Sequence, residues 1–110
     1  MTSRLTVAAS VAIAIYRELD DDYVGLWVLA WHVRRALPQV SDNDVRDISA
    51  AVLEALVGRD AALGTLDEAT GLFFYPWDAD AAVAVAMSAW RDLGRDPNIG
   101  GEIGWLALTS

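Results

Sequence analysis

Apolar side chains recur every three or four residues in four separate stretches of the chain, and this spacing constrains the fold more than any other feature. The stretches are 3–19, 22–37, 41–58 and 78–93. Such intervals place the apolar side chains on one face of an α-helix, which can then be buried against its neighbours. The sequence therefore predicts four helices that pack around a shared core.

Residues typical of helix ends bracket two of these stretches. Ser41 and Asp78 are their first residues and can accept hydrogen bonds from free backbone amides of the first turn. Gly58 ends the first of these stretches and Gly94 follows the second, and both suit the left-handed residue that ends many helices. The acidic run 20–22 is interpreted as the start of the second helix, because carboxylates oppose the positive end of the helix dipole.

The spacing changes between residues 62 and 75. Residues 63–66 and 72–75 suit two short strands, and Gly71 can supply the positive φ of a turn between them. Pro76 is expected to end the second strand. Because an isolated hairpin is only marginally stable, we expect it to pack against the helices. The apolar residues 103–108 fit a strand and a short helix equally well.

Together these elements predict an α+β fold that is mainly α, with about four helices and one β-hairpin. A length of 110 residues suits a single small globular domain, 1–110, and an apolar fraction of 55% is enough for one core. Residues 5–16 resemble a signal peptide only faintly, because the apolar part is short and a single charge precedes it. We expect a buried first helix instead.

Groups that carry catalysis are scarce. The chain has no cysteine and a single histidine, His32, which falls in the middle of a predicted helix. The acidic clusters 20–22 and 42–44 lack the ligand spacing of a calcium-binding loop and are interpreted as helix-start charges. We therefore expect no enzymatic activity, no metal and no cofactor. A small enzyme that uses His32 and carboxylates is the least favoured alternative.

The net charge of −8 limits the classes of partner. It repels a phosphate backbone and attracts a basic protein. A helix pair followed by a hairpin resembles the element order of a winged helix. However, the helix that would enter a major groove, 41–58, exposes mostly Asp, Asn and Glu, with Arg46 alone to contact phosphate. We expect no nucleic-acid partner and no membrane partner, and the absence of cysteine suits the cytoplasm.

Four aromatic residues around Pro76 form the strongest candidate binding site: Phe73, Phe74, Tyr75 and Trp77. Neighbouring side chains on a strand point to opposite faces, so some of these rings should be exposed. Aromatic residues with polar neighbours are typical of interfaces. We predict a non-enzymatic protein–protein interaction domain that uses these four residues, although all four could also pack inward.

Two alternatives concern the partner. The mostly apolar first helix could pair with a second copy of the chain in a homodimer. The acidic charge also suits an inhibitor of the immunity or antitoxin type, which would cover a basic surface of its partner protein.

Overall fold

The computed structural model describes residues 3–67, 69–70 and 73–109, and within them the chain forms four helices and a four-stranded antiparallel sheet. The helices are α1 (Arg4–Leu19), α2 (Trp27–Ala36), α3 (Asp42–Leu56) and α4 (Ala79–Leu93). The strands are β1 (Val24–Gly25), β2 (Ala61–Leu66), β3 (Phe74–Pro76) and β4 (Trp105–Leu108). The predicted α+β class, mainly α, is confirmed.

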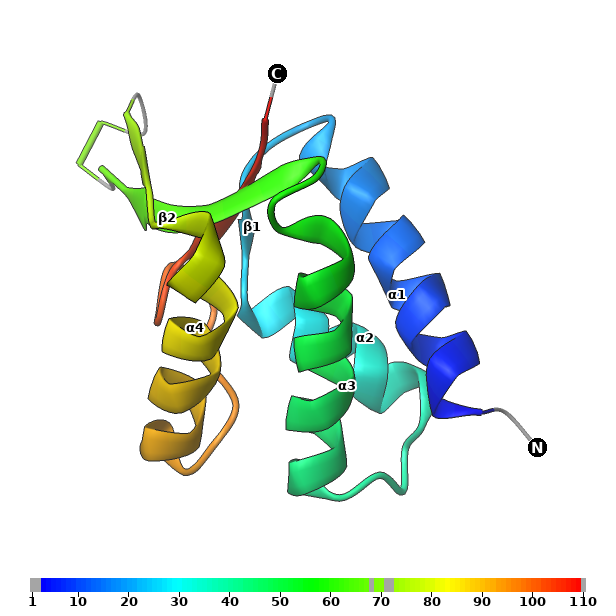
Figure 1. The fold of residues 1–110 in the computed structure, drawn as a ribbon. Helices are drawn as coiled ribbons and strands as arrows, with labels where there is room; N and C mark the ends of the chain where they lie inside the picture. The colour runs from blue at the N-terminus through cyan, green and yellow to red at the C-terminus, as the bar shows by residue number, and fades with distance from the viewer. Residues whose placement is uncertain (1–2, 68, 71–72, 110) are drawn as a thin grey trace.

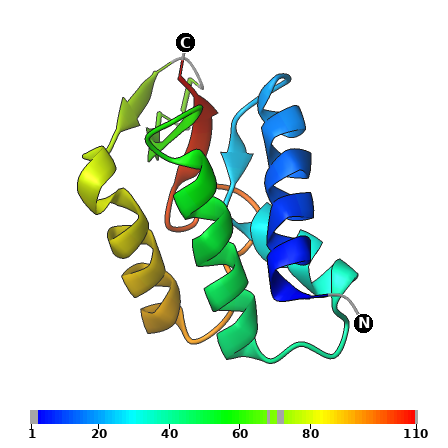
Figure 2. The same cartoon turned by 45° about the vertical axis from the view of Figure 1, so that its right-hand side comes forward.

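Helices α1, α3 and α4 lie side by side with α3 in the middle, and the sheet packs against one end of this layer (Figures 1 and 2). The shorter helix α2 packs against α1 and α3. Five of the largest fully buried side chains come from all four helices and the sheet: Ile15, Leu29, Leu53, Trp90 and Leu106. One hydrophobic core therefore joins the helices to the sheet.

The ends of α3 and α4 follow the capping residues that the sequence predicts. Ser41 and Asp78 each accept a hydrogen bond of 3.1 Å from a backbone amide of the first turn. Gly94 ends α4 in the left-handed conformation, with φ of 70°. Gly58 follows α3 with φ of 83°. These capping interactions involve only residues near the helix end, so the local sequence predicts them wherever the helix itself forms.

The second helix is shorter than predicted, and the prediction that residues 20–22 begin it is wrong. α2 begins at Trp27, whereas Asp20 stands at the C-terminal end of α1. Val24 and Gly25 instead form β1, which pairs with residues of β4 that lie 82 and 80 positions later in the chain. Tertiary pairing of this kind overrides a local helical spacing.

The sheet has the order β1-β4-β2-β3, so residues 105–108 lie between β1 and β2. Of the two alternatives for residues 103–108, the structure therefore contains the strand and not the short helix. The predicted hairpin is present as part of this larger sheet, with β2 at 61–66 and β3 at 74–76. Pro76 ends the second strand as predicted: it is the last residue of β3, an edge strand in which its missing N–H is tolerated. Gly71 lies outside the described residues.

The two faces of the sheet differ in the size of their side chains. One row faces the helices and contains three buried residues in register: Val24, Leu106 and Leu63. The next row, on the opposite face, consists of Gly25, Trp105 and Gly64. A Cβ on Gly64 would lie 2.8 Å from the Phe74 ring, so that ring rests directly on the glycine. The opposite face is therefore a shallow floor on which aromatic rings can lie.

Part of α1 faces away from the core. Leu5, which the sequence assigns to the buried stripe, is 81% exposed, and Ile13 and Tyr16 are also exposed. The other positions that the helical spacing places on or beside this stripe include all five buried residues: Val7, Ala8, Val11, Ile15 and Leu19. Leu5 is lost from it because α1 rests on α2 and α3 with the Val7 side of the helix. In the described ranges, none of the helices combines the length and apolarity needed to traverse a lipid bilayer.

Candidate functional site

The four predicted binding aromatics do not form one surface. Phe73 and Tyr75 are 57% and 58% exposed near the end of the hairpin. Phe74 points to the other face of the sheet and stacks on Tyr23, with ring centroids 5.8 Å apart. Trp77 is half-buried, and its indole N–H donates a hydrogen bond of 3.1 Å to Thr65. Two of the four rings are therefore engaged inside the fold, and a role for the set in partner binding stays a prediction.

A second aromatic surface lies on α2. Trp27 and Trp31 are one turn apart, so they project from the same side of the helix. Trp27 is half-buried, whereas Trp31 is 47% exposed. Arg35 follows after another turn, and its guanidinium lies 5.0 Å from the Trp31 ring centroid, within cation–π distance. This side of α2 therefore presents two indoles and a positive charge in a row.

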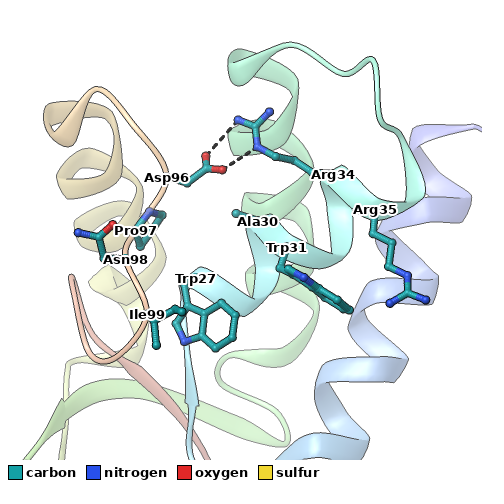
Figure 3. Close-up of a pocket in the computed structure, with 9 residues that line it drawn as sticks. All are labelled: Trp27, Ala30, Trp31, Arg34, Arg35, Asp96, Pro97, Asn98 and Ile99. Atoms are coloured by element: carbon teal, nitrogen blue, oxygen red, sulfur yellow. Dashed lines mark hydrogen bonds and ion pairs between the residues drawn. The ribbon is translucent and has the colours of Figure 1, made fainter.

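A hollow of about 520 Å³ separates these indoles from the loop 96–103 (Figure 3). We call it the Trp27–Trp31 hollow. Pro97 and Ile99 line it from the loop, and Figure 3 shows Ile99 beside Trp27. Ile99 is 82% exposed, which is unusual for a large apolar side chain that borders two tryptophans. The hollow is thus bounded by apolar surface on both sides.

Arg34 fixes the loop to the helices at one end of this hollow (Figure 3). Its Nε donates to Asp96 at 2.6 Å and its Nη2 donates to Asp42, at the start of α3, at 2.8 Å. The two carboxylates raise the pKa of Arg34 above its usual value. The charge of Arg34 is consequently compensated inside the protein, and Arg35 is the basic group of this hollow that has no carboxylate partner among the described residues.

The other end of the loop is held by a second ion pair. Arg95 donates to both oxygens of Glu102, at 2.6 and 2.9 Å. This pairing, together with the backbone N–H of Asn98, lowers the pKa of Glu102 to about 2. The next residue, Ile103, has φ of 75°, a strained conformation for a β-branched residue. The loop is therefore held in a defined shape at both ends.

A second hollow, of about 460 Å³, continues from the first, since Trp27 and Ile99 line both. Tyr23, which directly precedes β1, and Trp105 of β4 line it, and we call it the Tyr23–Trp105 hollow. Its floor includes Gly25, where a Cβ would lie 2.3 Å from the Gly100 carbonyl oxygen. The loop thus rests directly on β1. The two hollows together form one groove, here called the aromatic groove.

The charge of the groove changes along its length. Glu18, Asp21 and Asp22 line the Tyr23–Trp105 hollow, and an adjoining hollow of about 310 Å³ adds Asp20. Glu18 contacts His32, with 2.9 Å between its carboxylate and the imidazole Nε2. The end that lies near Arg35 is therefore partly positive, and the end at Tyr23 is negative.

The arrangement supplies aromatic surface and charge rather than a cluster of reactive groups. His32 has Glu18 and the edge of the Trp31 ring as its neighbours. Across the part of the chain that the structure describes, no three metal-ligating side chains come together. The groove therefore offers apolar contact surface together with charged groups.

The helical spacing of 22–37 predicts Trp27 on the core face of the second helix and Trp31 on an apolar flank, so it does not single them out as a binding site. The available signal was an excess of apolar residues on both sides of 22–37, more than one core-facing stripe can bury. The opposing wall depends on where the loop 96–103 lies, which no local pattern specifies.

Comparison with protein-family models, curated proteins and solved structures gives no match to this chain. The residues of the groove therefore carry the functional argument.

Proposed function

We propose that this protein is a non-enzymatic interaction domain that binds an extended segment of another protein in its aromatic groove. The observation that supports this is the continuity of the two hollows around Trp27 and Ile99. Tryptophan and tyrosine are enriched among the residues that contribute most to protein interfaces. Exposed apolar side chains that adjoin one another on a small protein are typical of binding surfaces.

The spacing of the two indoles suits an extended chain. Trp27 and Trp31 are separated by one helical turn, a rise of about 6 Å. Alternate side chains of an extended chain are about 6.5 Å apart and point the same way. A segment that lies along α2 can therefore place two side chains of one face against the two indoles. Arg35 is then positioned to donate hydrogen bonds to the carbonyl oxygens of that segment.

A selection from a displayed library of random 12-residue peptides tests this proposal. We expect the wild-type protein to enrich related peptides, and a selected peptide to bind Trp31→Ala at least about 30-fold more weakly, the loss typical of a central interface tryptophan. Isothermal titration calorimetry with the synthetic peptide gives the two dissociation constants. Circular dichroism checks that the variant is folded.

The matched control is Tyr75→Ala, which removes an aromatic side chain of similar exposure away from the groove. It should leave the affinity for the selected peptide unchanged. Failure to enrich any related peptides would contradict the proposal. Loss of binding in Tyr75→Ala but not in Trp31→Ala would indicate that the peptide binds to the hairpin and not to the groove.

The acidic inhibitor is the second candidate, favoured by the charge of −8 and by the carboxylates at the Tyr23 end of the groove. An inhibitor must bind a folded protein rather than a short segment. Its association should weaken steeply between 50 and 500 mM salt, because long-range attraction between unlike charges is screened. A partner that binds equally well throughout that range would contradict this candidate.

A further inference from the structure

The Tyr23–Trp105 hollow combines two kinds of group that recognise the same ligand chemistry. Its walls include three aromatic side chains, Tyr23, Trp27 and Trp105. Three carboxylates border it, from Glu18, Asp21 and Asp22, and no basic side chain is among the described residues that line it. Faces of aromatic rings attract cations, and carboxylates strengthen that attraction.

The carboxylates of this hollow remain largely uncompensated. Asp21 and Asp22 have no ion pair with a basic side chain in the described part of the chain, and Glu18 contacts His32. Elsewhere in the molecule, Arg34 and Arg95 are each paired with carboxylates. The unbalanced negative charge at this end of the groove therefore complements a positive group on the partner.

We infer that the Tyr23–Trp105 hollow receives an arginine or lysine side chain of the segment that binds in the aromatic groove. This inference rests on the proposed function, since the same segment would contact Trp27 and Trp31. Because Trp27 and Ile99 line both hollows, a segment that lies on the indoles of α2 continues into the acidic end. The charges then fix its direction, with the basic residue at Tyr23 and the apolar residues toward Trp31.

Peptides obtained by the selection described above provide the test. They should share one arginine or lysine next to their apolar positions, and replacing it by citrulline or acetyl-lysine should weaken binding about tenfold, as expected for a cation–π contact reinforced by charge. We define the ratio as the dissociation constant of the modified peptide divided by that of the unmodified peptide. In the double variant Asp21→Asn/Asp22→Asn this ratio should fall toward one. Asparagine can still accept the hydrogen bond that Asp22 receives from the Tyr23 N–H, which protects the local fold.

The matched control is Asp47→Asn/Asp92→Asn, which makes the same change in net charge at exposed sites on α3 and α4. It should preserve the tenfold ratio. This outcome would distinguish a local contact with Asp21 and Asp22 from attraction by the net charge of the whole protein. Selected peptides that lack a shared basic residue, or a ratio unchanged in Asp21→Asn/Asp22→Asn, would overturn the inference and leave the proposed function standing. If no peptides are enriched, both are overturned.

Discussion

Trp90 and Trp31 show how differently the two sides of this small protein use the same residue type. Trp90 lies on the inner side of α4 and is fully buried, whereas Trp31 on α2 is 47% exposed near Ile99, which is 82% exposed. The inner side of the layer of α1, α3 and α4 buries its large side chains in the core. The side formed by α2, the loop 96–103 and the open face of the sheet does not. Stability and binding are therefore expected to depend on separate residues.

The largest expected effect is the replacement Trp90→Ala. Removing a fully buried indole should lower the free energy of unfolding by about 3–5 kcal/mol, through lost burial and the cavity that remains. Trp31→Ala should change it by about 0.5 kcal/mol or less, as is usual at exposed positions. Urea denaturation of both variants measures the contrast. Comparable losses in the two would show that the exposed side is as important for stability as the packed one.

Gly25→Ala tests the contact between β1 and the loop 96–103. Its added Cβ would lie 2.3 Å from the Gly100 oxygen, so β1 or the loop must move. We expect a loss of about 1–3 kcal/mol, typical of overpacking, and a shift in tryptophan fluorescence from the change around Trp27. Unchanged stability and fluorescence would mean that the loop does not rest on β1.

Ser49→Ala should stabilise the protein, unlike Trp90→Ala and Gly25→Ala. Ser49 is fully buried in α3, and its hydroxyl has no hydrogen-bond partner among the described residues. Removing an unsatisfied polar group from the packed side, and gaining helix propensity, should raise the free energy of unfolding by about 1 kcal/mol. Ser88→Ala, at an exposed position of α4, is the control for propensity alone. A gain no larger than that of the control would indicate that the Ser49 hydroxyl is satisfied.

The smallest expected effect concerns the ion pair of Arg95 and Glu102, on the groove side. The pKa of Glu102 falls from 4.5 to about 2 in the folded protein. A lowered carboxyl pKa stabilises the fold fully above the unfolded value, and this contribution disappears as the pH falls from 4.5 toward 2. The melting temperature of Glu102→Gln should therefore lie below that of the wild type at pH 7, and the two should converge near pH 2. A difference that persists at pH 2 would assign the effect to packing.

The sequence predicts the packed side far better than the groove side. Helix spacing and the caps at Ser41 and Asp78 act within a few residues, and the corresponding helices are found within one or two positions of their predicted bounds. Two-residue β1 is too short to show a strand period, and its valine also fits the helical spacing of 22–37. What makes β1 a strand is its pairing with β4, a contact between distant parts of the chain.

The candidate site was predictable only as a type of chemistry. The sequence singles out the aromatic residues around Pro76, but Phe74 is occupied by its stacking on Tyr23, and a further aromatic surface includes Trp27 and Trp31. The glycine floor of the sheet and the path of the loop 96–103 decide which rings stay accessible. Both depend on the assembled sheet, so no pattern within one segment specifies them.

The central position of β4 has a consequence for synthesis of the protein on the ribosome. Leu106 of this strand is fully buried between Val24 and Leu63, yet it is translated after all the other helices and strands described. The emerging chain can form helical turns early, but its sheet lacks the strand between β1 and β2 until β4 is available. Pairings between such distant residues also slow folding. The nascent chain is therefore expected to expose the apolar edges of β1 and β2 until β4 has left the ribosome, a period in which chaperone binding or aggregation would compete with folding.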